Sequence, residues 1–181
     1  MIQSRRRALR QIGGFVLGGA TMLAAPRLVL AATDSRRLGF HNIHNDERLE
    51  AVYWQNGQYD QGALQEIDLA LRDWRNDAVK PVDRPLLDIL HELSRRLGTE
   101  EPYQVISAYR SPETNAMLAA QSGGVATKSL HLEAKAIDIA LSSGRLAELR
   151  DTAWEMQAGG VGWYADSFVH VDTGRVRRWN F

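Results

Sequence analysis

The pattern of apolar and polar positions predicts two amphipathic helices in the middle of the chain. In residues 60–75 and again in residues 83–97, apolar side chains recur at spacings of three and four, so they form one stripe along a helix. The stripes consist of Leu64, Ile67, Leu71 and Trp74 in the first segment and of Leu86, Leu90, Leu93 and Leu97 in the second. Asp83 is suited to cap the start of the second helix, and Gly98 to end it. Both helices are expected to cover a core.

Period-two alternation predicts strands elsewhere in the chain. The segments are residues 38–44, 48–54, 103–109, 137–141, 161–164 and 168–172. Two more helices are expected, one that opens at Ser111 with Pro112 in its first position and ends at residues 122–124, and one over residues 145–158 that Gly159–Gly160 stops. This arrangement indicates an α+β fold with a small central antiparallel sheet and flanking helices.

Residues 1–32 have the composition of an export signal. A basic start with Arg5–Arg6 is followed by a glycine-rich apolar stretch over residues 12–25, and Ala31–Ala32 offers a cleavage context of small residues. This order is typical of a twin-arginine signal peptide, and the apolar stretch is too short for a membrane-spanning helix. The alternative is the basic amphipathic start of a cytosolic protein. We therefore expect a domain over residues 33–181, export by the twin-arginine machinery to the periplasm, and no stable membrane span after cleavage.

The net charge changes when this segment is removed. Residues 1–32 hold five of the 22 basic residues of the chain and none of its 22 acidic residues, so the remaining 17 bases and 22 acids give a net charge of −5. Neither a basic tail nor a dense cluster of Lys and Arg occurs in the sequence, and no nucleic-acid partner is expected. The chain has no cysteine, which excludes disulfides and thiolate ligands. A metal site would have to use histidine and carboxylate side chains.

Three residues have the chemistry of such a site. Asp138 lies in the middle of the strand predicted for residues 137–141, where an unpaired carboxylate is costly to bury. His131 precedes that strand, and alternation around His170 places it on one face with Asp172. If the two strands are neighbours, Asp138 and His170 lie side by side and His131 closes the group. Two histidines and a carboxylate are a ligand set of catalytic zinc, with the fourth position left to water. Spacing alone leaves open the alternative of three hydrogen-bonded structural residues.

These motifs resemble the LAS superfamily, which comprises lysostaphin-type peptidases, D-Ala-D-Ala peptidases and the hedgehog signalling domain. Within it, the chain is most similar to the murein endopeptidase K-like zinc peptidases of bacterial cell walls. The resemblance rests on Ser129-x-His131, Ala136–Asp138, Phe168–Gly174, Ile106–Ser111, Thr114–Asn115, Gly159–Gly162 and Arg178–Trp179, in the order of the family. One departure is Ala134, where the family usually has a glycine that serves close backbone packing or an unusual dihedral angle. Alanine is the mildest replacement, so the site is expected to be intact.

The resemblance implies a fold like that of the hedgehog domain and the D,D-peptidases, with zinc at the edge of a cleft and His131, Asp138 and His170 as its ligands. It implies hydrolysis of peptide crosslinks in peptidoglycan, so stem peptides and crosslinks are the expected partners. It also places Arg110 in the cleft, where a guanidinium suits a peptide carboxylate or carbonyl. An exposed salt bridge is the alternative role of Arg110.

The general base is not at the position usual for many relatives. They have a glutamate three positions before the second histidine, where this chain has Ser167. Asp172 is the candidate, either as the base or as a carboxylate that holds a metal-binding histidine in one tautomer. Trp163 and Tyr164 either line a sugar-peptide cleft or pack in the core, and residues 175–181 either pack back on the domain or contact the polymer.

The sequence leaves several points of function open. The crosslink can be of the D,D or the L,D type, and the enzyme can be an endopeptidase or a carboxypeptidase. A catalytically silent wall-binding module of the same fold is the alternative to an enzyme. The oligomeric state is open as well.

Overall fold

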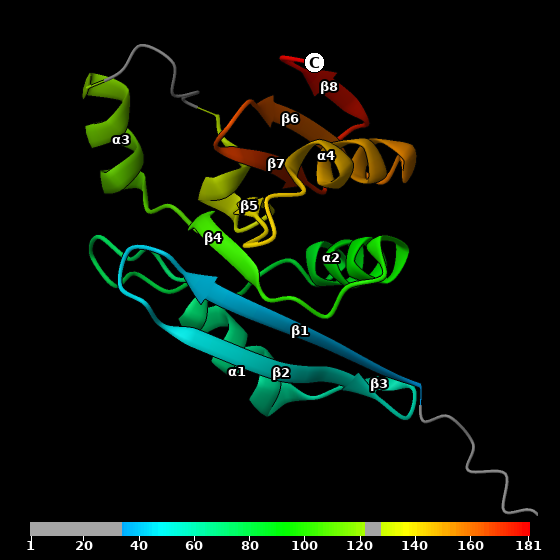
Figure 1. Cartoon of the computed structure of the whole chain (residues 1–181). Coiled ribbons are helices and arrows are strands. Elements are labelled where there is room, and N and C mark those ends of the chain that lie inside the picture. The colour runs from blue at the N-terminus through cyan, green and yellow to red at the C-terminus, as the bar shows by residue number, and fades with distance from the viewer. Residues whose placement is uncertain (1–33, 122–127) are drawn as a thin grey trace, which may run out of the picture. The chain divides into compact units, whose positions relative to one another are not determined.

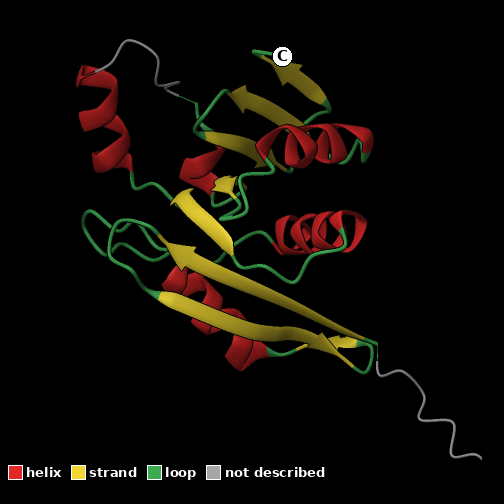
Figure 2. Cartoon of the chain, viewed as in Figure 1, coloured by secondary structure: helices red, strands yellow, loops and turns green. Residues whose placement is uncertain are grey.

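The computed structural model describes residues 34–121 and 128–181 (Figure 1). The predicted signal peptide and the helix end expected at residues 122–124 lie outside the described residues. In chain order the elements are β1 (Ser35–Asn42), β2 (Arg48–Gln55), β3 (Gln58–Tyr59), α1 (Gln61–Ala70), α2 (Arg84–Leu97), β4 (Tyr103–Ser107), α3 (Pro112–Gln121), the short 3-10 helix η1 (Leu130–Glu133), β5 (Ala136–Ala140), α4 (Leu146–Glu155), β6 (Gly160–Tyr164), β7 (Phe168–Asp172) and β8 (Arg177–Trp179). The fold is of the predicted α+β class (Figure 2).

The described strands form one sheet in the order β3-β2-β1-β4-β5-β7-β6-β8. Five of its seven neighbouring pairs are antiparallel, whereas β1 with β4 and β6 with β8 are parallel. The prediction of an antiparallel sheet was therefore wrong for these two pairs. Parallel neighbours need a long crossover, and the segment with β2, α1 and α2 supplies it between β1 and β4.

The hydrophobic core lies on one face of the sheet. Helices α2 and α4 pack side by side there, against β1, β6 and β7 (Figure 1). Ile137 and Ile139 of β5 and Val169 of β7 belong to this core and are fully buried. Because side chains alternate along a strand, Asp138 and His170 point to the opposite face of the sheet.

Helix α1 ends earlier than the stripe over residues 60–75 predicts. One local hydrogen bond and one bond from a distant segment hold the chain beyond it in another conformation. The Asp73 N–H donates to the Ala78 carbonyl at 2.9 Å, and the Tyr109 N–H donates to the Leu71 carbonyl at 3.1 Å. Leu71 is still buried as the stripe predicts, but it reaches the core from a loop.

Helix α2 has the predicted ends, whereas α4 is shorter than predicted. Helix α2 ends as predicted at Gly98, whose φ of 61° is left-handed. Asp83 is at the N-cap position, but its carboxylate accepts a hydrogen bond from the Thr173 hydroxyl at 2.6 Å and makes no capping bond. The helix predicted over residues 145–158 ends at Glu155, because the chain turns at Gln157 with a φ of 50°. Among the described residues, no helix is long and apolar enough to cross a membrane.

Candidate metal centre

Asp138 and His170 face each other across two antiparallel strands. β5 and β7 are neighbours, and their register pairs Asp138 directly with His170. Both side chains are buried. Residues directly opposite each other in such a pair have Cβ atoms about 4.5–5.5 Å apart, so this register alone brings the carboxylate and the imidazole together.

His131 joins them from η1, just ahead of β5. Ser129 caps η1, because its Oγ accepts a hydrogen bond from the His131 N–H at 3.3 Å. η1 ends at Ala134, whose φ of 53° and ψ of 32° are left-handed. Glycine adopts this conformation without strain, so the unusual dihedral angle expected at this position is present, and here an alanine adopts it. The His131 carbonyl also accepts a hydrogen bond from the Arg110 N–H at 3.1 Å, which fixes η1 against the loop after β4.

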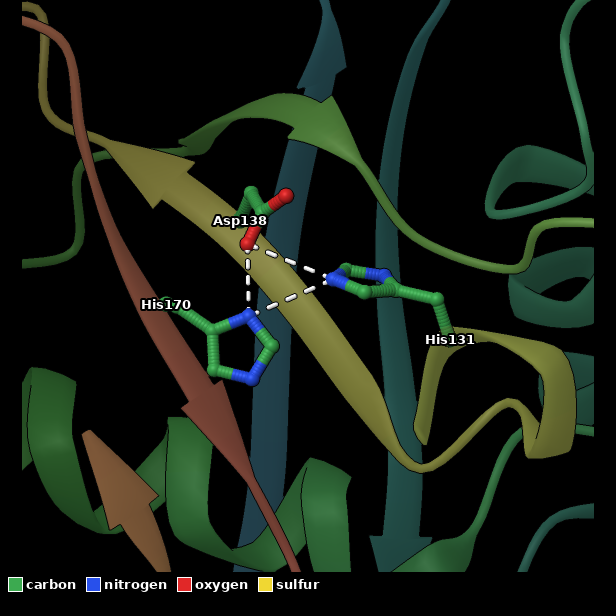
Figure 3. Close-up of side chains that lie close together, drawn as sticks. All are labelled: His131, Asp138 and His170. Carbon is green, nitrogen blue, oxygen red and sulfur yellow. Dashed lines mark hydrogen bonds and ion pairs between the residues drawn. The ribbon is translucent and has the colours of Figure 1, made fainter. Parts of the chain in front are cut away.

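The three side chains converge on one point (Figure 3). His170 Nδ1 lies 2.8 Å from Asp138 Oδ1 and 3.2 Å from His131 Nε2, and His131 Nε2 lies 3.3 Å from Asp138 Oδ1. A tetrahedral zinc ion with ligand distances of about 2.0–2.1 Å separates its ligand atoms by about 3.3 Å. The triangle therefore has the size of one face of such a site, slightly contracted between Asp138 and His170.

An acceptor holds the outer nitrogen of each imidazole. His131 Nδ1 lies 2.6 Å from the Ala108 carbonyl oxygen, and His170 Nε2 lies 3.1 Å from Asp172 Oδ2. These oxygens only accept, so they suit neutral rings that carry a proton on the outer nitrogen and direct the lone pair of the inner nitrogen toward the other two side chains. Two lone pairs and a carboxylate oxygen at these distances repel one another, and a cation between them would stabilise the arrangement. This set of donors suits zinc.

Burial and hydrogen bonding act in opposite directions on the titration of these groups. Burial raises the pKa of Asp138, but its interactions with His131 and His170 outweigh burial and hold this pKa well below its usual value. Burial lowers the pKa of His170, but the hydrogen bonds to Asp138 and Asp172 outweigh it and raise this pKa above its ordinary value. The centre therefore keeps ionised carboxylates, which balance positive charge at this point.

Asp172 is fully buried, and its side chain contacts that of His170 on the same face of β7, as alternation predicts. Its Oδ1 accepts hydrogen bonds from the N–H groups of Gly160 at 3.1 Å and Gly174 at 2.8 Å. Arg177 contacts both carboxylate oxygens, with Nη1 2.9 Å from Oδ1 and Nη2 2.7 Å from Oδ2. Burial raises the pKa of Asp172, but the contacts with His170 and Arg177 outweigh it and keep this pKa well below its usual value.

Arg110 lies beside η1, after the end of β4. Its Nη2 donates to the Ser107 hydroxyl at 3.3 Å, and its buried Nε has no hydrogen-bond partner within the described part of the chain. The predicted alternative of a salt bridge is not found among the ion pairs of the described residues. The residue is half-buried next to the candidate metal centre, and its guanidinium is suited to bind a carboxylate or a carbonyl.

The aromatic residues near the C-terminus divide between the two faces of the sheet. Trp163 packs partly buried against the core, with the Arg150 guanidinium 4.7 Å from its ring centre. Tyr164 is exposed, and its hydroxyl accepts a hydrogen bond from Trp179 Nε1 at 3.2 Å. The ring centre of Trp179 lies 5.1 Å from that of His170. The C-terminal residues thus pack back on the domain, beside the candidate metal centre.

The chain is similar to known proteins over nearly its whole length. The family model described as peptidoglycan L,D-endopeptidase MepK (Peptidase_M15_2) matches residues 30–179. The peptidoglycan L,D-endopeptidase MepK of Escherichia coli (strain K12) is 39% identical over 177 residues, which cover 97% of each chain. The probable peptidoglycan L,D-endopeptidase MepK of Haemophilus influenzae is 33% identical over 180 residues, which cover 98% of this chain and 97% of the relative.

Proposed function

Since the chain belongs to the family of the peptidoglycan L,D-endopeptidase MepK, we propose that it hydrolyses L,D peptide crosslinks of peptidoglycan with a zinc ion held by His131, Asp138 and His170. The match to the family spans residues 30–179 and so includes all three of these side chains. The description of the family favours the L,D crosslink and the endopeptidase among the alternatives that the sequence pattern leaves open.

One observation carries the metal part of the proposal. Three possible ligand atoms from separate segments lie within 3.3 Å of one another. No other group of three or more His, Asp or Glu residues within residues 34–121 and 128–181 could hold a metal ion. The outer nitrogen of each ring has an acceptor of its own, Ala108 for His131 and Asp172 for His170, so both inner nitrogens can act as ligands.

The residues of the chain prepare the site for hydrolysis. A bound zinc ion supplies a Lewis acid for the scissile carbonyl and lowers the pKa of a water ligand. The Ala108 carbonyl and the Asp172 carboxylate hold the rings of His131 and His170 with a lone pair inward. Arg110 is half-buried beside η1, and its guanidinium is suited to bind a carboxylate or the peptide carbonyl of the substrate and to orient the crosslink.

We assign Asp172 to holding His170 rather than to proton transfer. A general base must reach the attacking water or the leaving amine, directly or through one water. Both oxygens of Asp172 are occupied by Arg177 and the N–H groups of Gly160 and Gly174, and the side chain is fully buried. A carboxylate that accepts from the outer nitrogen of a metal-binding histidine fixes its orientation and raises its basicity.

We also propose that the protein reaches the periplasm by the twin-arginine route. Arg5–Arg6, the apolar stretch and the small residues at Ala31–Ala32 support this route. The proposed substrate supports it as well, because peptidoglycan lies outside the cytoplasmic membrane.

The purified protein and crosslinked muropeptides test the proposed activity. Muropeptides with L,D or D,D crosslinks are incubated with the protein, and the products are identified by chromatography and mass spectrometry. We expect cleavage of the L,D crosslink, its loss after treatment with a chelator, and its return when zinc is added. Cleavage that persists in protein shown to be metal-free would overturn the zinc assignment.

Two histidine variants test whether metal binding and cleavage depend on the proposed centre. His170→Ala should lose both metal and cleavage. His41→Ala is the matched control, because His41 lies on β1 and pairs with Asp46 at 2.6 Å, and it should keep both. If zinc-loaded wild-type protein cleaves neither crosslink but binds peptidoglycan, the silent wall-binding module would replace the enzyme as the proposed function.

A further inference from the structure

Side chains of the C-terminal strand β8 extend across β6 to the candidate ligand His170 on β7. β8 runs parallel to β6 and pairs Trp179 with Gly162, and Gly162 is in turn opposite His170 on β7. Side chains alternate along β8, so Arg177 and Trp179 share the face of the sheet that carries His170. Arg178 lies between them in the chain, and its guanidinium is 5.0 Å from the ring centres of Trp154 and Phe181.

Two glycines of β6 make this reach possible. A β-carbon at Gly160 would collide with the Arg177 guanidinium and the Asp172 carboxylate, and a β-carbon at Gly162 would collide with the indole of Trp179. The two glycines are two positions apart, so they leave one strip of β6 without side chains. Through this strip the side chains of β8 contact residues of β7.

Arg177 is connected to His170 through Asp172. Its two hydrogen bonds to Asp172, of 2.9 and 2.7 Å, form a fork that fixes the plane of the carboxylate. In that plane Asp172 Oδ2 lies 3.1 Å from His170 Nε2, the nitrogen opposite the one that faces Asp138. The position of Asp172 therefore sets the orientation of the His170 ring, and Arg177 sets the position of Asp172.

Trp179 limits the movement of the same ring by direct contact. Its ring centre is 5.1 Å from that of His170, with the ring planes at 57°. The hydrogen bond from Trp179 Nε1 to the Tyr164 hydroxyl, at 3.2 Å, fixes the indole in turn. A three-residue edge strand has few backbone hydrogen bonds of its own, so these side-chain contacts also hold β8 in place.

We propose that β8 is a clamp on His170, in which Arg177 acts through Asp172 and Trp179 acts by contact, and that this clamp sets the affinity of the centre for zinc. Arg177 and Trp179 are positioning residues. The inference rests on the metal centre of the proposed function. A carboxylate that orients a metal-binding histidine contributes a factor of about 10–100 in metal affinity, and Arg177 is expected to carry a factor of that size because it holds the carboxylate.

Zinc affinity measured by competition with a chromophoric chelator tests the clamp. The purified full chain is stripped of metal and compared with Arg177→Met and Arg178→Met. We expect Arg177→Met to bind zinc about 10–100-fold more weakly. Arg178→Met is the matched control, because it removes the neighbouring guanidinium on the other face of the same strand. It should stay within about twofold of the wild type.

Two further measurements separate a positioning role from loss of structure. The visible spectrum of the cobalt-loaded protein reports the geometry of the ligands and should change in Arg177→Met but not in Arg178→Met. In the Asp172→Asn background, Arg177→Met should cause no further loss of zinc affinity, since the path through Asp172 is already broken. Should Arg177→Met not fold, Arg177→Lys keeps the charge without the fork, and its affinity should lie between those of the wild type and Asp172→Asn.

Several results would overturn the clamp. They are wild-type affinity in Arg177→Met or, where that variant does not fold, in Arg177→Lys; an equal loss in Arg178→Met; and an undiminished effect of Arg177→Met in the Asp172→Asn background. Wild-type protein that binds no zinc would overturn the clamp together with the proposed centre. The wild-type measurement therefore distinguishes a failure of the centre from a failure of the clamp.

Discussion

Replacing Asp73 with alanine is expected to lower the free energy of unfolding by about 2–4 kcal/mol. Asp73 is 1% exposed and lies in the segment between α1 and α2. Its carboxylate accepts hydrogen bonds from the Ser111 N–H at 2.9 Å and from the Arg75 N–H at 3.1 Å. Alanine leaves the buried Ser111 N–H without a partner, which costs about 1–3 kcal/mol, and removes the half-buried bond to Arg75, which contributes about 0.5–1.5 kcal/mol.

The same carboxylate makes the loss dependent on pH. Burial raises the pKa of Asp73, but the hydrogen bonds from Thr114, Ser111 and Arg75 outweigh burial and hold this pKa below its usual value. In the unfolded chain the pKa is about 3.9. The contribution of ionised Asp73 to stability is therefore fully present above the unfolded pKa and is lost as the pH falls through the lower, folded pKa. Asparagine has no such titration, so the difference in stability between wild type and Asp73→Asn should shrink below about pH 4.

Urea unfolding followed by tryptophan fluorescence measures both effects. A chelator is present throughout, so that metal binding does not contribute to stability. Asp77→Asn is the matched control, because Asp77 is an exposed carboxylate of the same segment whose ion pair with Arg72 should be worth less than about 1 kcal/mol. A loss below about 1 kcal/mol in Asp73→Ala would refute the reasoning. Stability curves of wild type and Asp73→Asn that stay parallel through the acid range would refute it as well.

Substitutions at three other places test the cleft, the sheet and the export signal. Arg110→Met should raise KM for L,D-crosslinked muropeptides by about 10–100-fold through the loss of charge-assisted hydrogen bonds, and an unchanged KM in steady-state kinetics would contradict this role. Gly162→Ala should displace Trp179, which would lower the free energy of unfolding by about 1–3 kcal/mol and alter the tryptophan fluorescence; wild-type behaviour in both would speak against the contact. Replacing Arg5 and Arg6 with lysine should leave precursor in the cytoplasm on cell fractionation, whereas a normal periplasmic yield would argue against the twin-arginine route.

The sequence predicts an element well where local signals decide its ends. Helix α2 begins after Asp83 and ends at Gly98 as predicted, because the start and stop residues and the apolar stripe agree. Helix α1 is shorter than its stripe, because the bond from the distant Tyr109 N–H to the Leu71 carbonyl and the turn between Asp73 and Ala78 decide where it ends. The parallel pairing of β1 with β4 depends on the whole path between them, and no local pattern contains it.

Alternation of side chains explains why the candidate centre could be predicted from the sequence. It places His170 on the face of its strand that looks away from the core, and it does the same for Asp138. One assumption, that the two strands are neighbours, then brings them together, and the structure has this pairing. The role of Asp172 could not be decided in the same way. Whether a carboxylate acts as a base or holds a ligand depends on its burial and its hydrogen-bond partners. For Asp172, two of these partners, Gly160 on β6 and Arg177 on β8, come from other segments of the chain.

The sequence analysis assigned no role to Arg177, although the sequence contains a signal for one. A buried carboxylate needs a compensating cation, and the C-terminal segment offers Arg175, Arg177 and Arg178. Gly160 and Gly162 are two positions apart on β6, and Arg177 and Trp179 are two positions apart on β8. The two large side chains of β8 therefore lie over the two glycines of β6, where no side chain is in the way. This match of period selects Arg177, because it shares the face of Trp179, and it excludes Arg178, which lies between them. Paired glycines at alternate positions next to a candidate ligand strand therefore indicate that another segment crosses there, and the side chains of that segment are candidates for positioning the ligand.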